Sequence, residues 1–96
     1  MLVLVCYDVS TITPDGARRL RKTAHTCLNF GLRVQHSVFE CNVTPAQWEL
    51  LKDKLLSIYD AEHDSLRFYF LGANWKNRVE HHGCGEIQDI EDPMII

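Results

Sequence analysis

The hydrophobic positions begin with an uninterrupted run at the start of the chain, in the stretch "LVLVCYDVS" at residues 2–10. Residues 2–6 are all apolar and lack the alternation of a strand that faces water on one side. We therefore expect residues 2–9 to form a strand that is buried on both faces. Because this apolar strand delivers Asp8 near its end, the role of that carboxylate is the first question that the sequence raises.

A helix is predicted after this strand, over "PDGARRLRKTAHTCLNF". Thr13 can cap its first turn, Pro14 suits the first helical position, and Gly31 is a suitable stop. Residues at helical spacing predict the side that packs on the core: Ala17, Leu20, Ala24, Cys27 and Leu28. The opposite side is expected to carry Arg18, Arg19, Lys22 and His25.

The segment 33–44, "RVQHSVFECNVT", alternates with a period of two but has no turn signal in its middle. It predicts either one long bent strand or two short strands joined by a kink. Thr44 and Gln47 then predict the capping box of a second helix. Its apolar stripe is expected at Trp48, Leu51, Leu55, Ile58 and Tyr59. Strands are expected at 66–71 and, near a sheet edge, within 75–83.

This order of elements favours the α+β class, as a ferredoxin-like βαββαβ sandwich with an extra C-terminal strand. We expect residues 1–83 to form this domain and residues 84–96 to form an acidic tail, whose docking on a partner subunit is left open. Both helices would cover one face of the sheet, although the strand at residues 2–9 is apolar on both faces. In a chain of 96 residues, a second copy is the simplest cover for the other face, so we predict a homodimer packed through its sheets.

The charges of the chain are unevenly distributed. The chain holds 10 Lys and Arg and 13 Asp and Glu, for a net charge of −3. Residues 9–39 nevertheless carry five bases and one acid, whereas residues 40–66 carry six acids and two bases. A pole of one sign attracts ligands of the other sign even when the total is near neutral, so the basic stretch fits either a nucleic-acid partner or a solvated helix face.

Membrane and zinc signals are absent from the sequence. No apolar run approaches the ~20 residues needed to span a bilayer, so no membrane partner is expected. The four cysteines, at positions 6, 27, 41 and 84, form no C-x-x-C pair. These features favour reduced thiols and a cytoplasmic protein.

A two-fold axis would change what Asp8 can do. In one chain it is an isolated carboxylate, for which a turn or cap before the first helix is the simplest role. Two copies ~4 Å apart would repel by about 4 kcal/mol at an effective dielectric near 20, and a divalent ion or a shared proton relieves this repulsion. Magnesium is usually held by one or two carboxylates with waters and phosphate oxygens, so a shared magnesium site is the alternative.

Four motifs in this order, "VCYDVS", "RRLRK", "GLRVQHSVFEC" and "DSLRFYFL", resemble the small CRISPR-associated nuclease family that is usually called Cas-two. The ending "NWKNRVEHHG…DPMII" is similar to the branch found in type I-C systems. The resemblance covers nearly the whole chain and implies a ferredoxin-like homodimer whose C-terminal strand packs against the partner's sheet. The tail "GCGEIQDIEDP" is more acidic than the family pattern, so its docking stays open.

The resemblance also implies an activity and a site. The activity is metal-dependent endonucleolytic cleavage of double-stranded DNA, which we favour, or of RNA, in spacer acquisition and antiviral defence with the CRISPR integrase. Asp8 matches the catalytic residue that binds Mg²⁺ across the dimer axis, with Mn²⁺ as an alternative ion. Nucleic-acid contacts are expected from Arg18, Arg19, Lys22 and Arg33, and which first-helix arginine contacts phosphate is left open. Supporting positions are Tyr7, Ser37 and Phe39, for which plain packing or a strand kink is the alternative.

Two functions therefore remain from the sequence. One is a magnesium-dependent nuclease, and the other is a non-catalytic dimeric adaptor that holds duplex DNA between integrase subunits. Both use the basic residues, whereas only the nuclease needs Asp8.

Overall fold

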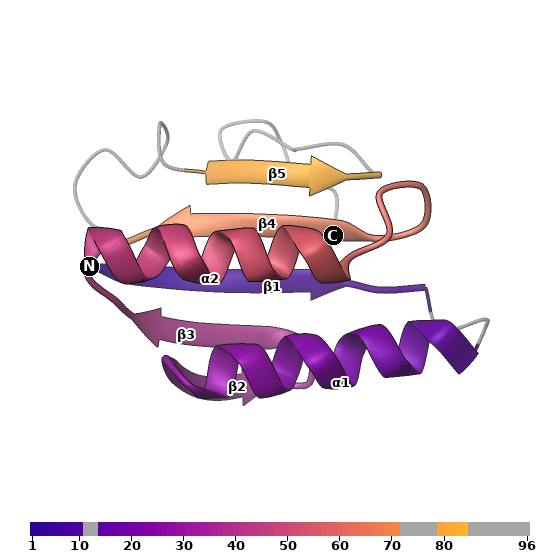
Figure 1. The fold of residues 1–96 in the computed structure, drawn as a ribbon, viewed down its shortest axis with the longest axis horizontal. Coiled ribbons are helices and arrows are strands. Elements are labelled where there is room, and N and C mark those ends of the chain that lie inside the picture. The colour runs from indigo at the N-terminus through magenta and orange to yellow at the C-terminus, as the bar shows by residue number, and fades with distance from the viewer. Residues whose placement is uncertain (11–13, 72–78, 85–96) are drawn as a thin grey trace, which may run out of the picture.

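The computed structural model describes residues 1–10, 14–71 and 79–84, which form a five-stranded sheet with two helices in front of one face (Figure 1). The elements in chain order are β1 (Leu2–Asp8), α1 (Pro14–Leu28), β2 (Gly31–Gln35), β3 (Val38–Asn42), α2 (Pro45–Ile58), β4 (Ser65–Phe70) and β5 (Val79–Gly83). The order across the sheet is β2-β3-β1-β4-β5, and every neighbouring pair is antiparallel. The predicted α+β fold with an added edge strand is confirmed.

Both helices begin where their local signals predict. The α2 capping box is present, because the Thr44 hydroxyl accepts from the Gln47 amide at 3.2 Å and the Gln47 side chain accepts from the Thr44 amide at 2.8 Å. The helix α1 begins at Pro14, while its predicted cap Thr13 lies outside the described residues. Among the described residues, no helix is long and apolar enough to cross a membrane.

The core lies between the helices and the sheet. From β1, Val3, Val5 and Tyr7 point into it and are fully buried, whereas the alternate residues are half-buried up to Cys6 and exposed at Asp8. The Trp48 ring of α2 meets the Phe68 ring edge-on, with centroids 4.8 Å apart. Within one chain, β1 is therefore fully buried on its helix side and only partly buried on the other, which we call the open face of the sheet.

The buried side of α1 differs from the prediction. Ala17 and Leu28 were expected in the core but are exposed, while Gly16 and Thr23 are buried with the expected Leu20, Ala24 and Cys27. Apolarity was a poor guide because neither Gly16 nor Thr23 has an apolar side chain that the hydrophobic pattern could detect. Leu28 is 50% exposed because α1 ends there. In α2, Trp48, Leu51 and Leu55 are buried as expected, and Ile58 and Tyr59 are half-buried.

The segment left open by the sequence forms two strands. A tight turn at His36 and Ser37 joins β2 to β3, and the ladder shifts register between Arg33 and Gln35. Gly31, expected as a helix stop, is instead the first residue of β2. A Cβ there would lie 1.9 Å from the carbonyl oxygen of Glu40, so glycine is required for the close approach of the two strands.

Replacing this glycine tests the close approach. We expect Gly31→Ala to lower the free energy of unfolding by about 1–3 kcal/mol, because the new methyl group must displace the β3 backbone. The matched control is Leu50→Ala, at a side chain of α2 that is 60% exposed, with an effect within about 0.5 kcal/mol. Urea unfolding followed by circular dichroism measures both, and equal midpoints for the two variants would contradict the explanation.

Candidate functional site

Asp8 is the last residue of β1, and its backbone pairs with Ser65 of β4. Strand alternation places its side chain with Leu4 and Cys6, because Val3, Val5 and Tyr7 all point to the helices. The Asp8 side chain is exposed. A carboxylate is therefore presented on the open face of the sheet, at the end of its central strand.

The described part of one chain brings no preformed group of metal ligands to this position. In the described ranges, no group of three or more His, Cys, Asp or Glu side chains is arranged to hold a metal ion. Magnesium needs one or two carboxylates, with waters or phosphate oxygens as its remaining ligands. The exposed Asp8 carboxylate is of the ligand type that this ion prefers.

Tyr7, next to Asp8, points into the protein. It is 1% exposed, and its hydroxyl donates a hydrogen bond to a carboxylate oxygen of Asp64. Burial and this bond raise the pKa of Tyr7 well above its usual value. The Tyr7 side chain is therefore packed in the core and anchored there by Asp64.

The Asp64 carboxylate is fully buried and satisfied by hydrogen bonds. We call this residue and its donors the Asp64 cluster. Besides the Tyr7 hydroxyl, it accepts from Arg19 Nε at 2.7 Å and Arg19 Nη2 at 3.1 Å, and from the amides of Ser10 at 3.1 Å and Asp60 at 3.0 Å. Burial would raise the pKa of Asp64, but the bonds from Arg19, Tyr7 and the two amides outweigh it and lower the pKa to about 2. This buried group is therefore an anion at neutral pH.

The two adjacent arginines of α1 have different surroundings. The Arg19 side chain is 16% exposed, and its guanidinium is bound to Asp64 at two points. Arg18 is 63% exposed and lies 3.9 Å from the carboxylate of Asp15. Lys22 is also exposed. Arg18 and Lys22 thus lie on the solvent side as predicted, whereas Arg19 does not.

The remaining predicted residues surround the β2–β3 turn. Arg33 is exposed, but its Nε and Nη2 donate to the His36 carbonyl oxygen at 2.7 and 2.5 Å. Its guanidinium lies 5.5 Å from the ring centre of Phe39, which is fully buried. The Ser37 carbonyl oxygen accepts from the Tyr7 amide at 2.9 Å. The β2–β3 turn therefore contacts the end of β1 through the Ser37 carbonyl group. Phe39 is a core residue.

Two residues near Asp8 were missed by the sequence reasoning. The backbone of Arg67 pairs with that of Cys6, which places Arg67 on the open face. It lies two residues along β4 from Ser65, the ladder partner of Asp8. Asp64 lies directly before β4, and its carboxylate accepts hydrogen bonds from Tyr7 and Ser10, which precede Asp8 and follow Val9. Both belong to the motif "DSLRFYFL", in which the alternation of Ser65 and Arg67 was the available signal.

Comparison with known proteins identifies one family throughout. The family model for CRISPR associated protein Cas2 matches residues 1–79. The chain is 62% identical over 96 residues to the CRISPR-associated endoribonuclease Cas2 of Chlorobaculum tepidum, covering 100% of both chains. It is 54% identical over 95 residues to the CRISPR-associated endonuclease Cas2 of Halalkalibacterium halodurans, covering 99% of each. The crystal structure of Streptococcus pyogenes Cas2 at pH 6.5 is similar with a TM-score of 0.73 and 56% identity, over 83% of this chain and 96% of that chain.

The unequal surroundings of the two arginines lead to a prediction. Arg19→Ala should lower the free energy of unfolding by roughly 3–5 kcal/mol, because it leaves the buried Asp64 carboxylate without its cation. Arg18→Ala, which removes an exposed pair, should cost less than about 1 kcal/mol. Urea unfolding at pH 7 measures both. Similar losses in the two variants would show that the Arg19–Asp64 pair is not what stabilises this end of the sheet.

Proposed function

Because this chain belongs to the CRISPR-associated Cas2 family, we propose that it is an endonuclease whose metal site is completed by a second copy of the chain. The observation that carries the proposal is the position of Asp8, an exposed carboxylate on the open face at the end of the central strand.

The open face supports the homodimer. Both described helices lie on the other face, so Leu4 and Cys6 of β1 are only half-buried here, and Leu32 of β2 is 69% exposed. The register places all three on this face, since Leu4 and Leu32 both pair with Glu40. A second copy stacked on this face through a two-fold axis would bury these side chains and bring two Asp8 carboxylates towards the axis.

Such a pair of carboxylates suits Mg²⁺, with Mn²⁺ as an alternative. Their mutual repulsion is relieved by a divalent cation, and carboxylate oxygens are the ligands that these ions prefer. When bound, the ion polarises a phosphoryl oxygen and activates water for hydrolysis. The protein's part is to hold the two Asp8 groups and to orient the phosphodiester.

The exposed bases provide the phosphate contacts of the proposal. Arg19 is bound to Asp64, so we assign phosphate binding on α1 to Arg18 and Lys22. The exposed Arg33 at the β2–β3 turn supplies a further guanidinium group. Contacts of this kind position a backbone without reading its sequence, so binding is expected to be nonspecific and sensitive to salt.

The finer assignments rest on the sequence resemblance. We propose double-stranded DNA as the substrate, and the names of relatives such as that of Chlorobaculum tepidum support RNA as the second class. The ending "NWKNRVEHHG…DPMII" favours the type I-C branch, with a cytoplasmic role beside the CRISPR integrase in spacer acquisition and antiviral defence. A non-catalytic adaptor bridging integrase subunits is the second candidate, favoured by the lack, among the described residues of one copy, of three or more His, Cys, Asp or Glu side chains grouped to hold a metal ion.

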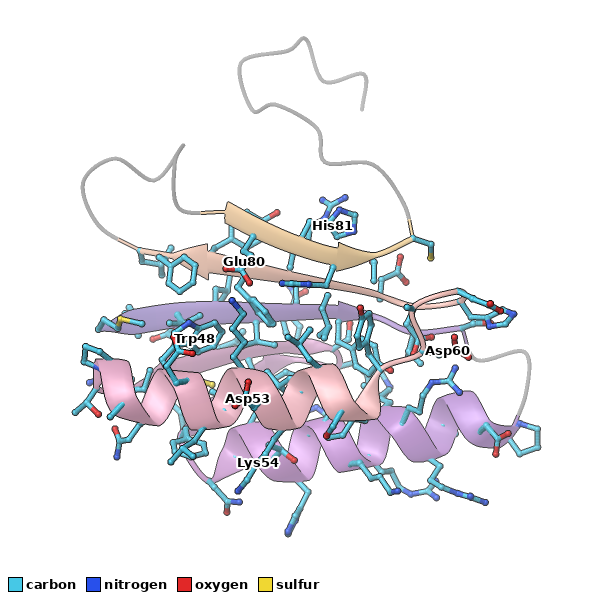
Figure 2. All side chains as sticks on the ribbon, turned by 45° about the horizontal axis from the view of Figure 1, so that its top comes forward. Trp48, Asp53, Lys54, Asp60, Glu80 and His81 are labelled. Carbon is cyan, nitrogen blue, oxygen red and sulfur yellow. The ribbon has the colours of Figure 1, made fainter. Side chains whose placement is uncertain are left out.

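The two candidates differ in their need for Asp8. Asp8→Asn should reduce Mg²⁺-dependent cleavage by at least about 100-fold, since loss of a metal ligand removes several kcal/mol of transition-state stabilisation. Cleavage of duplex DNA and single-stranded RNA with and without Mg²⁺ measures this effect. Light scattering and DNA binding should show an intact dimer and unchanged affinity. Asp53→Asn is the control, because Asp53 is exposed on α2 (Figure 2). Undiminished cleavage by Asp8→Asn would refute the nuclease assignment.

The phosphate contacts predict a change in salt dependence. The double variant Arg18→Ala with Lys22→Ala should weaken duplex binding and reduce the slope of log K against log salt by about 2, for two lost contacts. The control is Lys54→Ala, at an exposed lysine of α2 (Figure 2). Fluorescence anisotropy between 50 and 200 mM salt, a range in which such contacts lose much of their affinity, measures the slope. An unchanged slope would exclude this side of α1 as the nucleic-acid surface.

A further inference from the structure

Asp64 is hydrogen-bonded to residues on both sides of Asp8 in the chain. The Tyr7 hydroxyl, from the residue before Asp8, donates to one carboxylate oxygen of Asp64, and the Ser10 amide donates to the other at 3.1 Å. The residue that follows Asp64 is Ser65, the β-ladder partner of Asp8. Asp8 thus lies between two residues that bond one buried carboxylate, and its ladder partner follows that carboxylate in the chain.

The main chain of Asp64 is in turn restrained by the end of β5. Its carbonyl oxygen accepts from the Cys84 amide at 2.9 Å. Gly83 has a φ of +101°, and a Cβ at this residue would lie 2.1 Å from the same carbonyl oxygen. Only glycine therefore fits against Asp64 without displacing it. Asp64 is therefore in contact both with the end of the edge strand β5 and, through Tyr7, with the end of the central strand β1.

Stability alone does not account for a charge at this place. A buried ion pair contributes little compared with apolar side chains of similar volume, although it fixes the geometry of the groups that it joins. The groups joined here come from β1, α1 and the loop before β4, where Asp60 lies beside the end of β1 (Figure 2). A carboxylate that restrains both flanks of a site residue is the supporting layer that precise sites need.

We propose that Asp64 is the positioning residue of the Asp8 site and that Gly83, at the end of β5, sets the position of Asp64. The inference rests on the proposed function, because the site to be positioned is the metal-binding carboxylate. Asp64 itself is fully buried and does not contact the metal or the phosphodiester. Its effect passes through Tyr7 and Ser10 to Asp8.

Two variants of the full chain test this role. Tyr7→Phe removes one donor and keeps the ring in the core, and Gly83→Ala pushes on the Asp64 carbonyl group. In each we expect hydrogen exchange of the Ser10 amide in the metal-free protein to rise by about 10-fold, since its bond to Asp64 is loosened. Titration with Mn²⁺ should show binding weakened by about 10-fold, as for other outer-layer substitutions.

A core variant separates positioning from stability. Leu51→Val in α2 removes a methylene from a fully buried side chain that lies outside the Asp64 cluster. It should lower the melting temperature while leaving Ser10 exchange and Mn²⁺ affinity unchanged. The inference is overturned if Ser10 exchange is unchanged in Tyr7→Phe and Gly83→Ala, or if Leu51→Val reproduces both effects. Equal Mn²⁺ affinity of the wild type and Asp8→Asn would instead overturn the proposed metal site.

Discussion

The buried carboxylate of Asp64 is the constraint on which this end of the sheet depends. Removing an anion from water costs several kcal/mol, so a fully buried one is tolerated only when donors surround it. Its donors belong to β1 and the residues just after it, to α1, and to the loop before β4, and Tyr7, Ser10 and Arg19 lie 45 to 57 positions from Asp64 in the sequence. All three must reach their places together for the charge to be satisfied. The requirement therefore selects one arrangement of these segments.

The end of β1 serves two purposes because strand neighbours point to opposite faces. Tyr7 points inwards to the Asp64 cluster, and Asp8 points outwards on the open face. The hydrogen bond to Asp64 and the exposed carboxylate therefore belong to adjacent residues of one strand. This proximity explains how a chain of 96 residues can present an exposed carboxylate from a rigid element rather than from a loop.

The sequence predicted well what depends on local signals. Pro14 and the Thr44–Gln47 pair marked the helix starts, and apolar periodicity gave the order of strands and helices. The sequence prediction failed where contacts between residues far apart in the chain determine the structure. Arg19 looked like its neighbour Arg18 because the partner that distinguishes them, Asp64, lies 45 residues away. The hairpin at residues 31–42 lacked turn residues, so its chain reversal was undecided. The position of Asp8 was expected, but the groups that restrain it were not.

The register shift in β2 has a consequence for how these molecules behave at high concentration. An outer strand with a regular ladder exposes a continuous row of amide and carbonyl groups, to which a strand of another molecule can add. Between Arg33 and Gln35 that row is interrupted, and the backbone is diverted by the extra residue. Growth of fibres from this margin of the folded protein is thereby hindered. The same irregularity that complicates the hairpin thus protects against self-templated aggregation.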